Sequence, residues 1–295
     1  MNSRASALLC GSILPQRWGA GPVYHRWDPA QVFVIVTAYG DESGTHDGPD
    51  GSPIMMLAGY VATLGQWNRF DVGWRRAIAR AGLPGYFHAT EHWDTEAGAK
   101  FAPYARKLEK KRIRFGYVFE LDKASYEQHY IAGNRPLKPQ LDTRYSVCFR
   151  FLLSLLLTKL PSLFMREDLT LNIVLEKGAK GSTDSLRIVE QLRKQPETRD
   201  AAKILGRVTF GQKTKFPGLQ ISDALSFGSL KIAPTNPGMT DLQQDAPLSA
   251  WEKAVQWKPP IYHCRLDETL LGAFKNDILA LAEINRRISD EAKKR

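Results

Sequence analysis

Apolar runs separated by turn residues open the ordered pattern of this chain. Val, Phe and Ile dominate residues 32–40, and residues 53–63, "PIMMLAGYVAT", form a second run of the same kind. Such runs are typical of buried strands. Because Gly48, Pro49 and Gly51 lie between them, we predict that the two strands form a β-hairpin.

The residues after the hairpin alternate between helical and strand patterns. Trp67, Phe70, Trp74 and Ile78 recur at three- and four-residue spacing, which predicts a helix that ends near Gly82. Further strands are expected at 114–122, 169–178 and 206–211, and further helices at 143–160, 184–195 and 219–231. This alternation predicts an α/β fold, a mixed sheet flanked by helices.

The last part of the chain has a different pattern. Residues 233–260 are expected to be an irregular insert, since they contain five prolines: Pro234, Pro237, Pro247, Pro259 and Pro260. A long amphipathic helix should follow, capped by Asp267 and marked by Leu270, Leu271, Phe274, Ile278, Leu281 and Ile288. We therefore expect a leader over 1–30, a main domain over 31–232, and a segment over 233–295 whose helix packs on that domain.

Composition and charge narrow the class of protein. The net charge of +10 and the isoelectric point near 9.5 favour an anionic partner, nucleic acid before an acidic membrane surface. Three scattered cysteines argue against a disulfide framework and against a cysteine zinc site, and favour the cytoplasm. The most apolar segment, 147–165, is interrupted by Arg150, Lys159 and Pro161, so we expect a buried helix and no membrane span. Residues 1–27 contain arginines but no acid, and we expect a flexible leader there.

Three acids occupy the positions where an α/β sheet builds a site. Asp41 follows the first strand, Glu176 follows a later strand, and Asp223 lies in an apolar helix start, "LQISDALSF". The carboxyl ends of strands are where open sheets bind ligands, so these acids could converge. Clustered carboxylates need a cation, and oxygen ligands suit Mg²⁺ or Mn²⁺. Two such ions can hold the attacking and leaving oxygens of a phosphodiester.

Each acid alone has commoner roles, as a helix cap, a loop residue or half of a salt bridge. Glu42 lies beside Asp41, and a persisting strand pleat would turn the two side chains to opposite faces, so we select Asp41 as the ligand. His88 or Glu91 could assist the cluster as an outer ligand or proton-transfer group. A hydrogen-bonded core histidine is an equally good interpretation of His88.

Five segments resemble a known family: "AYGDESGTH", "LAGYVA", "FHATEHW", "IVLEKG" and "LQISDALSF". Together they are similar to the bacterial family called domain of unknown function thirty-eight-hundred, over roughly residues 34–231. The motifs place the family's first acid on Asp41, its histidine motif on His88, and its Q-x-x-D motif on Gln220 and Asp223. The family commonly has Asp where this chain has Glu176. The resemblance implies a ribonuclease-H-like fold and a metal-dependent nuclease activity.

Two other motifs support rival or accessory sites. "HATEH" (88–92) matches the H-x-x-E-H pattern of an inverted zinc-peptidase motif, which needs a helix, whereas Pro84 and Gly85 precede it. The basic run over 100–114 could follow a phosphate backbone or be a solvated helix face. The residues expected to contact nucleic acid are Lys107, Lys110, Lys111 and Arg112.

The sequence thus predicts a phosphodiesterase that acts on nucleic acid with Mg²⁺ or Mn²⁺. The expected metal ligands are Asp41, Glu176 and Asp223, assisted by Glu42, His88 or Glu91. The alternative from another class is a catalytically silent binding module on the same fold, and a zinc peptidase is more remote. The sequence does not distinguish DNA from RNA, endo from exo cleavage, or a monomer from an oligomer.

Overall fold

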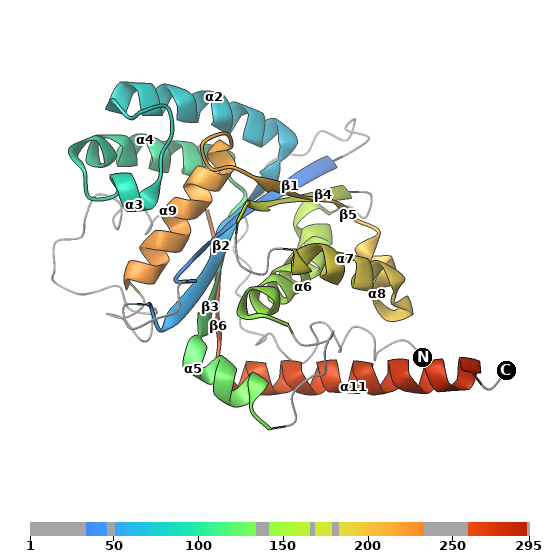
Figure 1. Cartoon of the computed structure of the whole chain (residues 1–295). Helices are drawn as coiled ribbons and strands as arrows, with labels where there is room; N and C mark the ends of the chain where they lie inside the picture. Colours follow the sequence, from blue (N-terminus) through green and yellow to red (C-terminus); the bar gives the residue numbers. More distant parts are fainter. Residues whose placement is uncertain are drawn as a thin grey trace.

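The computed structural model describes residues 34–45, 51–133, 142–165, 169–178, 183–232 and 259–293. They form a six-stranded mixed sheet flanked by helices on both faces (Figure 1). The strand order is β5-β4-β1-β2-β3-β6. The strands are β1 (Val34–Ser43), β2 (Ile54–Thr63), β3 (Phe115–Asp122), β4 (Leu169–Glu176), β5 (Leu205–Gly211) and β6 (Ile261–Leu266). The predicted α/β class and the flanked mixed sheet are confirmed.

The chain connections leave the adjacent strands β1 and β4 in opposite directions across the sheet. The predicted hairpin is present, because β1 pairs antiparallel with β2, which also pairs antiparallel with β3. The pairs β1–β4, β4–β5 and β3–β6 are parallel. The chain leaves β1 toward β2 on one side, and it leaves β4 toward β5 on the other. The carboxyl ends of β1 and β4 therefore meet at a topological switch point, where open sheets bind ligands.

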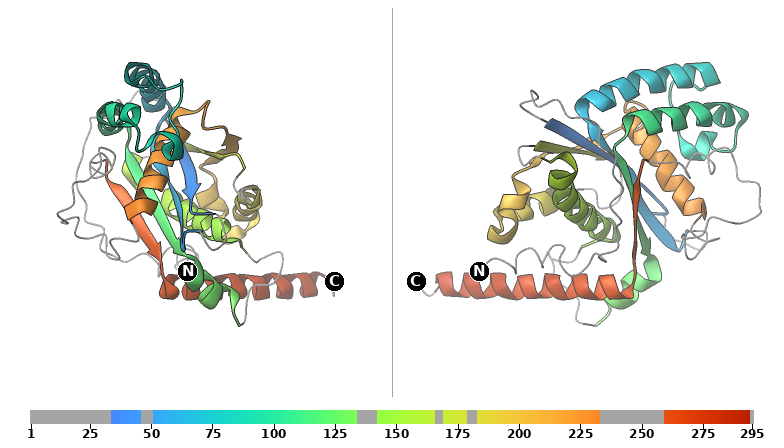
Figure 2. Two further views of the ribbon diagram at one scale, coloured as in Figure 1. Left: turned by 60° about the vertical axis from the view of Figure 1, so that its left-hand side comes forward. Right: turned by 180° about the vertical axis from the view of Figure 1, so that it is seen from behind.

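Each face of the sheet has its own hydrophobic core. One face packs against α2 (Leu64–Ala81), α4 (Glu96–Arg112) and α9 (Pro217–Ile232), with the short α3 (Ala89–His92) beside them. The other packs against α6 (Arg144–Phe164), α7 (Asp184–Lys194) and α8 (Pro196–Ala202). The short α5 (Lys123–Ser125) continues into the π-helix η2 (Tyr126–Ile131) at one end of the sheet. The long α11 (Glu268–Lys293) packs against η2 at this end (Figure 2).

The apolar helix α6 is a core element. By length and composition it could cross a membrane, yet 67% of its most apolar window is buried inside the protein. The sequence pattern predicted an end at 160, before Pro161, whereas the helix continues to Phe164. That end was wrong because Phe164 is buried and extends the packing of the helix past the proline.

The C-terminal segment adds a strand that the sequence pattern did not predict. β6 pairs with β3 at the edge of the sheet, and most of its residues are half-buried. Its sequence, IYHCRL, is short and mixes apolar with charged residues, so its periodicity is weak. The predicted cap is confirmed, since Asp267 Oδ1 accepts a hydrogen bond from the Leu270 amide at 2.9 Å. The leader over 1–30 lies outside the described residues, as do residues 233–258 of the insert predicted over 233–260.

Candidate functional site

Asp41 and Glu176 lie next to each other at the switch point. The β1–β4 ladder ends at the Gly40–Leu175 pair, and each acid directly follows one member of that pair. Both belong to the sheet face that α9 covers, since Asp41 pairs with Ala58 of that core. The side chain of Asp41 is 0% exposed, whereas Glu176 is half-buried. The sequence prediction that these two acids could converge agrees with this placement.

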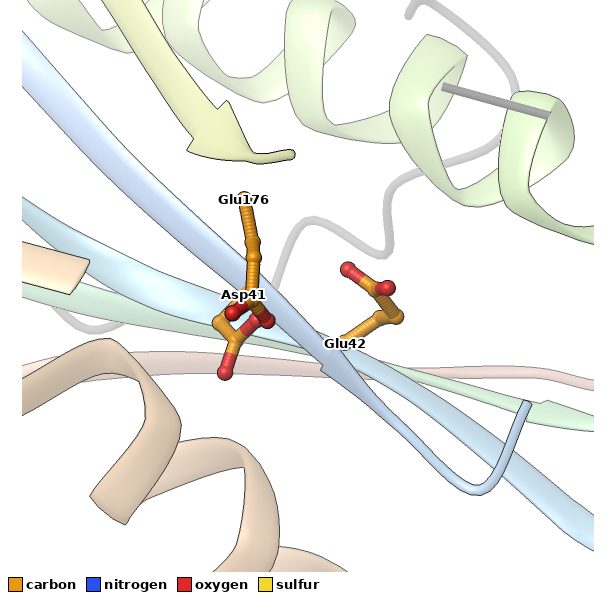
Figure 3. A group of neighbouring side chains, drawn as sticks. All are labelled: Asp41, Glu42 and Glu176. Atoms are coloured by element: carbon orange, nitrogen blue, oxygen red, sulfur yellow. The ribbon is translucent and has the colours of Figure 1, made fainter. Parts of the chain in front are cut away.

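Glu42 also joins the cluster. Strand alternation turns it toward the opposite face, as expected. Nevertheless, one carboxylate oxygen each from Asp41, Glu42 and Glu176 lies within 4.8 Å of the others (Figure 3). No β1–β4 pairing is present beyond Gly40 in the described ladder, and the longer glutamate side chain reaches past the strand. Among the residues that the structure describes, these three form the group with the spacing of a metal site.

A tight turn at Gly44 follows β1 directly after these acids. Gly44 has φ +75°, and a Cβ at this position would collide with the carbonyl oxygen of Ile54. Only glycine adopts this conformation at no steric cost. The D-E-S-G sequence therefore combines two acids with the turn that ends the strand.

Lys213 is the residue that the sequence interpretation missed. It lies in the turn after β5, and its side chain is 11% exposed. Its Nζ lies 3.0 Å from Asp41 Oδ2, 2.9 Å from Glu176 Oε2 and 2.9 Å from Asp223 Oδ1. The three acids predicted as metal ligands thus converge on an ammonium group. A signal was present, because Lys213 follows β5 as Glu176 follows β4, and the carboxyl ends of parallel neighbours meet at one edge.

The Q-x-x-D motif of α9 organises the surrounding backbone. Asp223 is buried, and its Oδ2 accepts a hydrogen bond from the Ala89 amide at 2.6 Å, while Oδ1 accepts one from Lys213. One turn earlier, Gln220 Oε1 accepts hydrogen bonds from Trp74 Nε1 at 2.8 Å and from the Phe87 amide at 2.9 Å. Its Nε2 donates to the carbonyl oxygen of Lys213 at 2.8 Å. Both side chains therefore fix the segment before α3 and the turn after β5.

The electrostatics of the cluster reflect an excess of negative charge. Burial raises the pKa of Asp41 well above its usual range, and the neighbouring Glu176 and Asp223 add to this shift. Burial and the repulsion by Glu176 raise the pKa of Glu42 to about 7. Burial opposes the charge of Lys213, yet the attraction by the acids outweighs it and raises the pKa of the ammonium. For Glu176, the interactions with Asp41 and Lys213 outweigh burial and lower the pKa.

A pocket of about 380 Å³ opens beside the cluster. Its walls include Glu176 and Lys213 together with His88 and Glu91, the two predicted accessory residues. His88 Nδ1 lies 3.0 Å from Glu91 Oε1, and the Tyr86 hydroxyl donates to Glu91 Oε2 at 2.7 Å. His88 and Glu91 thus line the approach to the carboxylates.

The "HATEH" segment lacks the geometry of a zinc-peptidase helix. His88 has an extended backbone, with φ −134° and ψ 124°, and α3 contains four residues. His92 Nδ1 lies 3.0 Å from the His88 amide, so that its ring is engaged with the backbone. In the described part of the chain, these side chains do not form a group of three ligand atoms with metal spacing.

The predicted nucleic-acid contacts lie on the helix that precedes β3. Lys107, Lys110, Lys111 and Arg112 belong to the last turns of α4. This helix leads into the amino end of β3, where the Arg114 amide donates to the carbonyl of Val61, the partner of Ala38 in the middle of β1. The carboxylates lie further along, toward the carboxyl ends of β1 and β4, so the basic run enters the sheet on the amino side of β3 and the cluster lies on the carboxyl side of β1.

The cluster meets a chemical test for a divalent cation. Within the described residues, neither buried oxygen of Asp41 accepts a hydrogen bond, although Lys213 lies at ion-pair distance. Buried oxygens normally have partners. Among the described residues, Asp41, Glu176 and Asp223 share the ammonium of Lys213, and Glu42 adds a fourth carboxylate beside Asp41 and Glu176. Oxygen donors of this kind fit Mg²⁺ or Mn²⁺.

No family model matches the chain, and neither a curated protein nor a solved structure matches it.

Proposed function

We propose that the protein is a metal-dependent phosphodiesterase that hydrolyses nucleic acid, a nuclease of ribonuclease-H-like fold. The observation that carries this proposal is the excess of negative charge around Asp41. Its buried oxygens accept no hydrogen bond from the described residues, and the Lys213 ammonium is shared among Asp41, Glu176 and Asp223 while Glu42 adds a fourth carboxylate. Buried carboxylates that outnumber their cations are costly unless a further cation compensates them.

Asp41, Glu42 and Glu176 would hold Mg²⁺ or Mn²⁺, whose bound form supplies a Lewis acid and an activated water for phosphodiester hydrolysis. The pocket residues have complementary roles. Lys213 and the neighbouring Lys177 would attract the phosphate group, and His88 is placed to exchange a proton at the mouth.

The order of elements supports the ribonuclease-H-like fold that the family resemblance implies. A hairpin comes first, strands and helices then alternate, and α9, the helix that contains Asp223, follows the fifth strand. The family motifs also meet in space, because Asp41 and Asp223 share Lys213, and Asp223 binds the segment that begins at His88. We infer nucleic acid as the substrate from the net charge of +10.

A cleavage assay tests the function. The wild-type protein with Mg²⁺ or Mn²⁺ is expected to cut labelled DNA or RNA, and a chelator is expected to stop it. Asp41→Asn keeps the shape but removes the charge, and should lower the rate by at least about a hundredfold. Asp200→Asn, at an exposed acid paired with Lys203, is the matched control and should cut normally. Equal cutting by all three forms would contradict the proposal.

The second candidate is a binding module without catalysis. The position of Lys213 favours it, since an ammonium among three acids also compensates charge without a metal. A calorimetric titration separates the candidates. Salt-sensitive binding of nucleic acid by a wild-type protein that takes up neither Mg²⁺ nor Mn²⁺ would support the module.

A further inference from the structure

We propose that Lys213 replaces the second metal ion, so that the site holds one divalent cation on Asp41, Glu42 and Glu176 with the Lys213 ammonium as the other positive centre. This inference rests on the proposed metal-dependent function. It changes the two-ion arrangement expected from sequence into a site with one ion and one lysine.

Asp223 has both of its oxygens engaged. Oδ2 accepts the Ala89 amide at 2.6 Å, and Oδ1 accepts Lys213 Nζ at 2.9 Å. Lys213 Nζ lies within 3.0 Å of oxygens of Asp41, Glu176 and Asp223, so a second ion shared between Asp223 and these acids would have to displace the ammonium. By contrast, Asp41 Oδ1 and Glu42 Oε2 are buried oxygens without a hydrogen-bond partner among the described residues, and the contact of Asp41 with Lys213 is made through Oδ2. The oxygens left for one ion therefore lie on Asp41 and Glu42, with a Glu176 oxygen at ligand spacing from them.

The lysine is held in place through its backbone. The Lys213 carbonyl accepts a hydrogen bond from Gln220, a buried amide that is itself fixed by Trp74 and Phe87. Two residues later, the Lys215 carbonyl accepts a hydrogen bond from Arg75 Nη2 at 3.4 Å. The turn is thus anchored to α2 and α9, which aims the ammonium at the carboxylates.

The ammonium also faces the place where a substrate would enter. Lys213 lines the 380 Å³ pocket together with Lys177, Thr214 and Gln212. A phosphate group in this pocket would meet the ammonium on one side and the ion on the carboxylates on the other. Lysine is a common phosphate ligand that acts as a point charge. The site would thereby present two positive centres while it binds one metal ion.

The number of bound Mn²⁺ ions tests this inference. Equilibrium dialysis of the apo protein at saturating Mn²⁺ is expected to give one ion per wild-type chain and two per Lys213→Ala chain. The substitution frees oxygens of Asp41, Glu176 and Asp223 for a second ion. Lys213→Arg should retain one ion because it keeps the charge. Lys177→Ala, at an exposed lysine of the same pocket, is the matched control and should also bind one.

The outcomes separate this inference from the proposed function. Two ions on the wild type, or one ion on Lys213→Ala, would overturn the role of Lys213 and leave the metal site intact. Absence of binding by the wild type would remove the metal-dependent function itself. Should Lys213→Ala fail to fold, the electron paramagnetic resonance spectrum of the wild type decides. A spectrum of isolated Mn²⁺ is expected, and a spin-coupled pair would refute the inference.

Discussion

The acids of the cluster differ because their surroundings differ. Asp41 is buried and lacks a hydrogen-bond donor among the described residues, Glu42 reaches the cluster from the other face, and Asp223 is bonded to backbone and lysine. Asp41 and Glu42 have a raised pKa, mainly because burial disfavours their charged forms. A divalent cation would favour those charged forms, so metal binding and proton release should be linked.

This linkage predicts the pH dependence of metal affinity. Since the pKa of Glu42 is about 7, a proton competes with the ion below that pH. The affinity for Mn²⁺ should rise roughly tenfold from pH 6 to pH 8. In Glu42→Gln it should be weaker and rise less. Calorimetric titrations of both proteins at several pH values measure this, and parallel slopes would contradict a role for Glu42.

The same shift has the opposite sign for stability without metal. The folded protein retains a proton on Glu42 that the unfolded chain releases near pH 4.5, the ordinary value for Glu. The stabilisation is complete below that value and is lost as the pH rises through about 7. Metal-free protein should therefore unfold more easily at pH 8 than at pH 6, and saturating Mn²⁺ should reverse this trend.

Among the elements, those with strong periodicity were predicted well. The hairpin, the strand at β4 and the helices α2 and α9 follow from clear apolar patterns. β6 and the π-helix η2 were not predicted, because β6 is short and half-buried and η2 continues directly from α5. Lys213 was missed for a different reason. Its position after a predicted strand was visible in the sequence, but its role depends on β5 lying beside β4, and local pattern does not give the order of strands in a sheet.

Gln220 illustrates how one element positions others. Its amide joins α9 to α2, to the segment before α3 and to the Lys213 turn. Gln220→Leu leaves the Trp74 and Phe87 N–H groups buried without this acceptor, and should lower the free energy of unfolding by about 2–4 kcal/mol. Urea denaturation measures this loss. Gln212→Leu, at an exposed position of the same turn, should change the free energy of unfolding little. An equal loss in both variants would contradict the role of the buried Gln220 amide in joining these elements.

Another acid with a raised pKa, Glu109, lies outside the cluster, where α4 packs on β2. Burial raises the pKa of Glu109 to about 8, against a hydrogen bond of 2.7 Å donated by the Tyr60 hydroxyl. Its stabilising proton is retained at low pH and lost as the pH rises through about 8. The free energy of unfolding should fall by about 1 kcal/mol from pH 7 to pH 9 through this group. Glu109→Gln should lack that part of the decrease in pH-dependent urea denaturation, and an unchanged profile would show that Glu109 is ionised throughout.

At the scale of the whole molecule, two of its basic groups bear on how a nucleic acid would bind. Lys177 and Lys213 line the pocket beside the carboxylates, with the exposed Lys215 in the same turn as Lys213. The basic end of α4 leads into the amino end of β3, whereas the carboxylates lie at the carboxyl ends of β1 and β4. A nucleic acid whose phosphate occupies the pocket would therefore contact the first group directly.

The salt dependence of binding distinguishes the two groups. Each lost phosphate contact reduces the slope of log affinity against log salt by about 0.7–0.9. Replacing Lys177 and Lys215 by Gln should reduce the slope by about 1–2 and weaken binding of labelled oligonucleotides. The matched replacement of Lys107 and Lys111 by Gln should have a smaller effect. The reverse ranking would place the nucleic acid along α4 instead.

The central claim is that the carboxyl ends of β1 and β4 form a metal centre. The most direct measurement is the anomalous difference map of a crystal soaked in Mn²⁺. Our account predicts a peak bonded to Asp41, Glu42 and Glu176, with metal–oxygen distances of about 2.1 Å. A map with no peak at these residues under saturating Mn²⁺, with Lys213 still among the carboxylates, would contradict it.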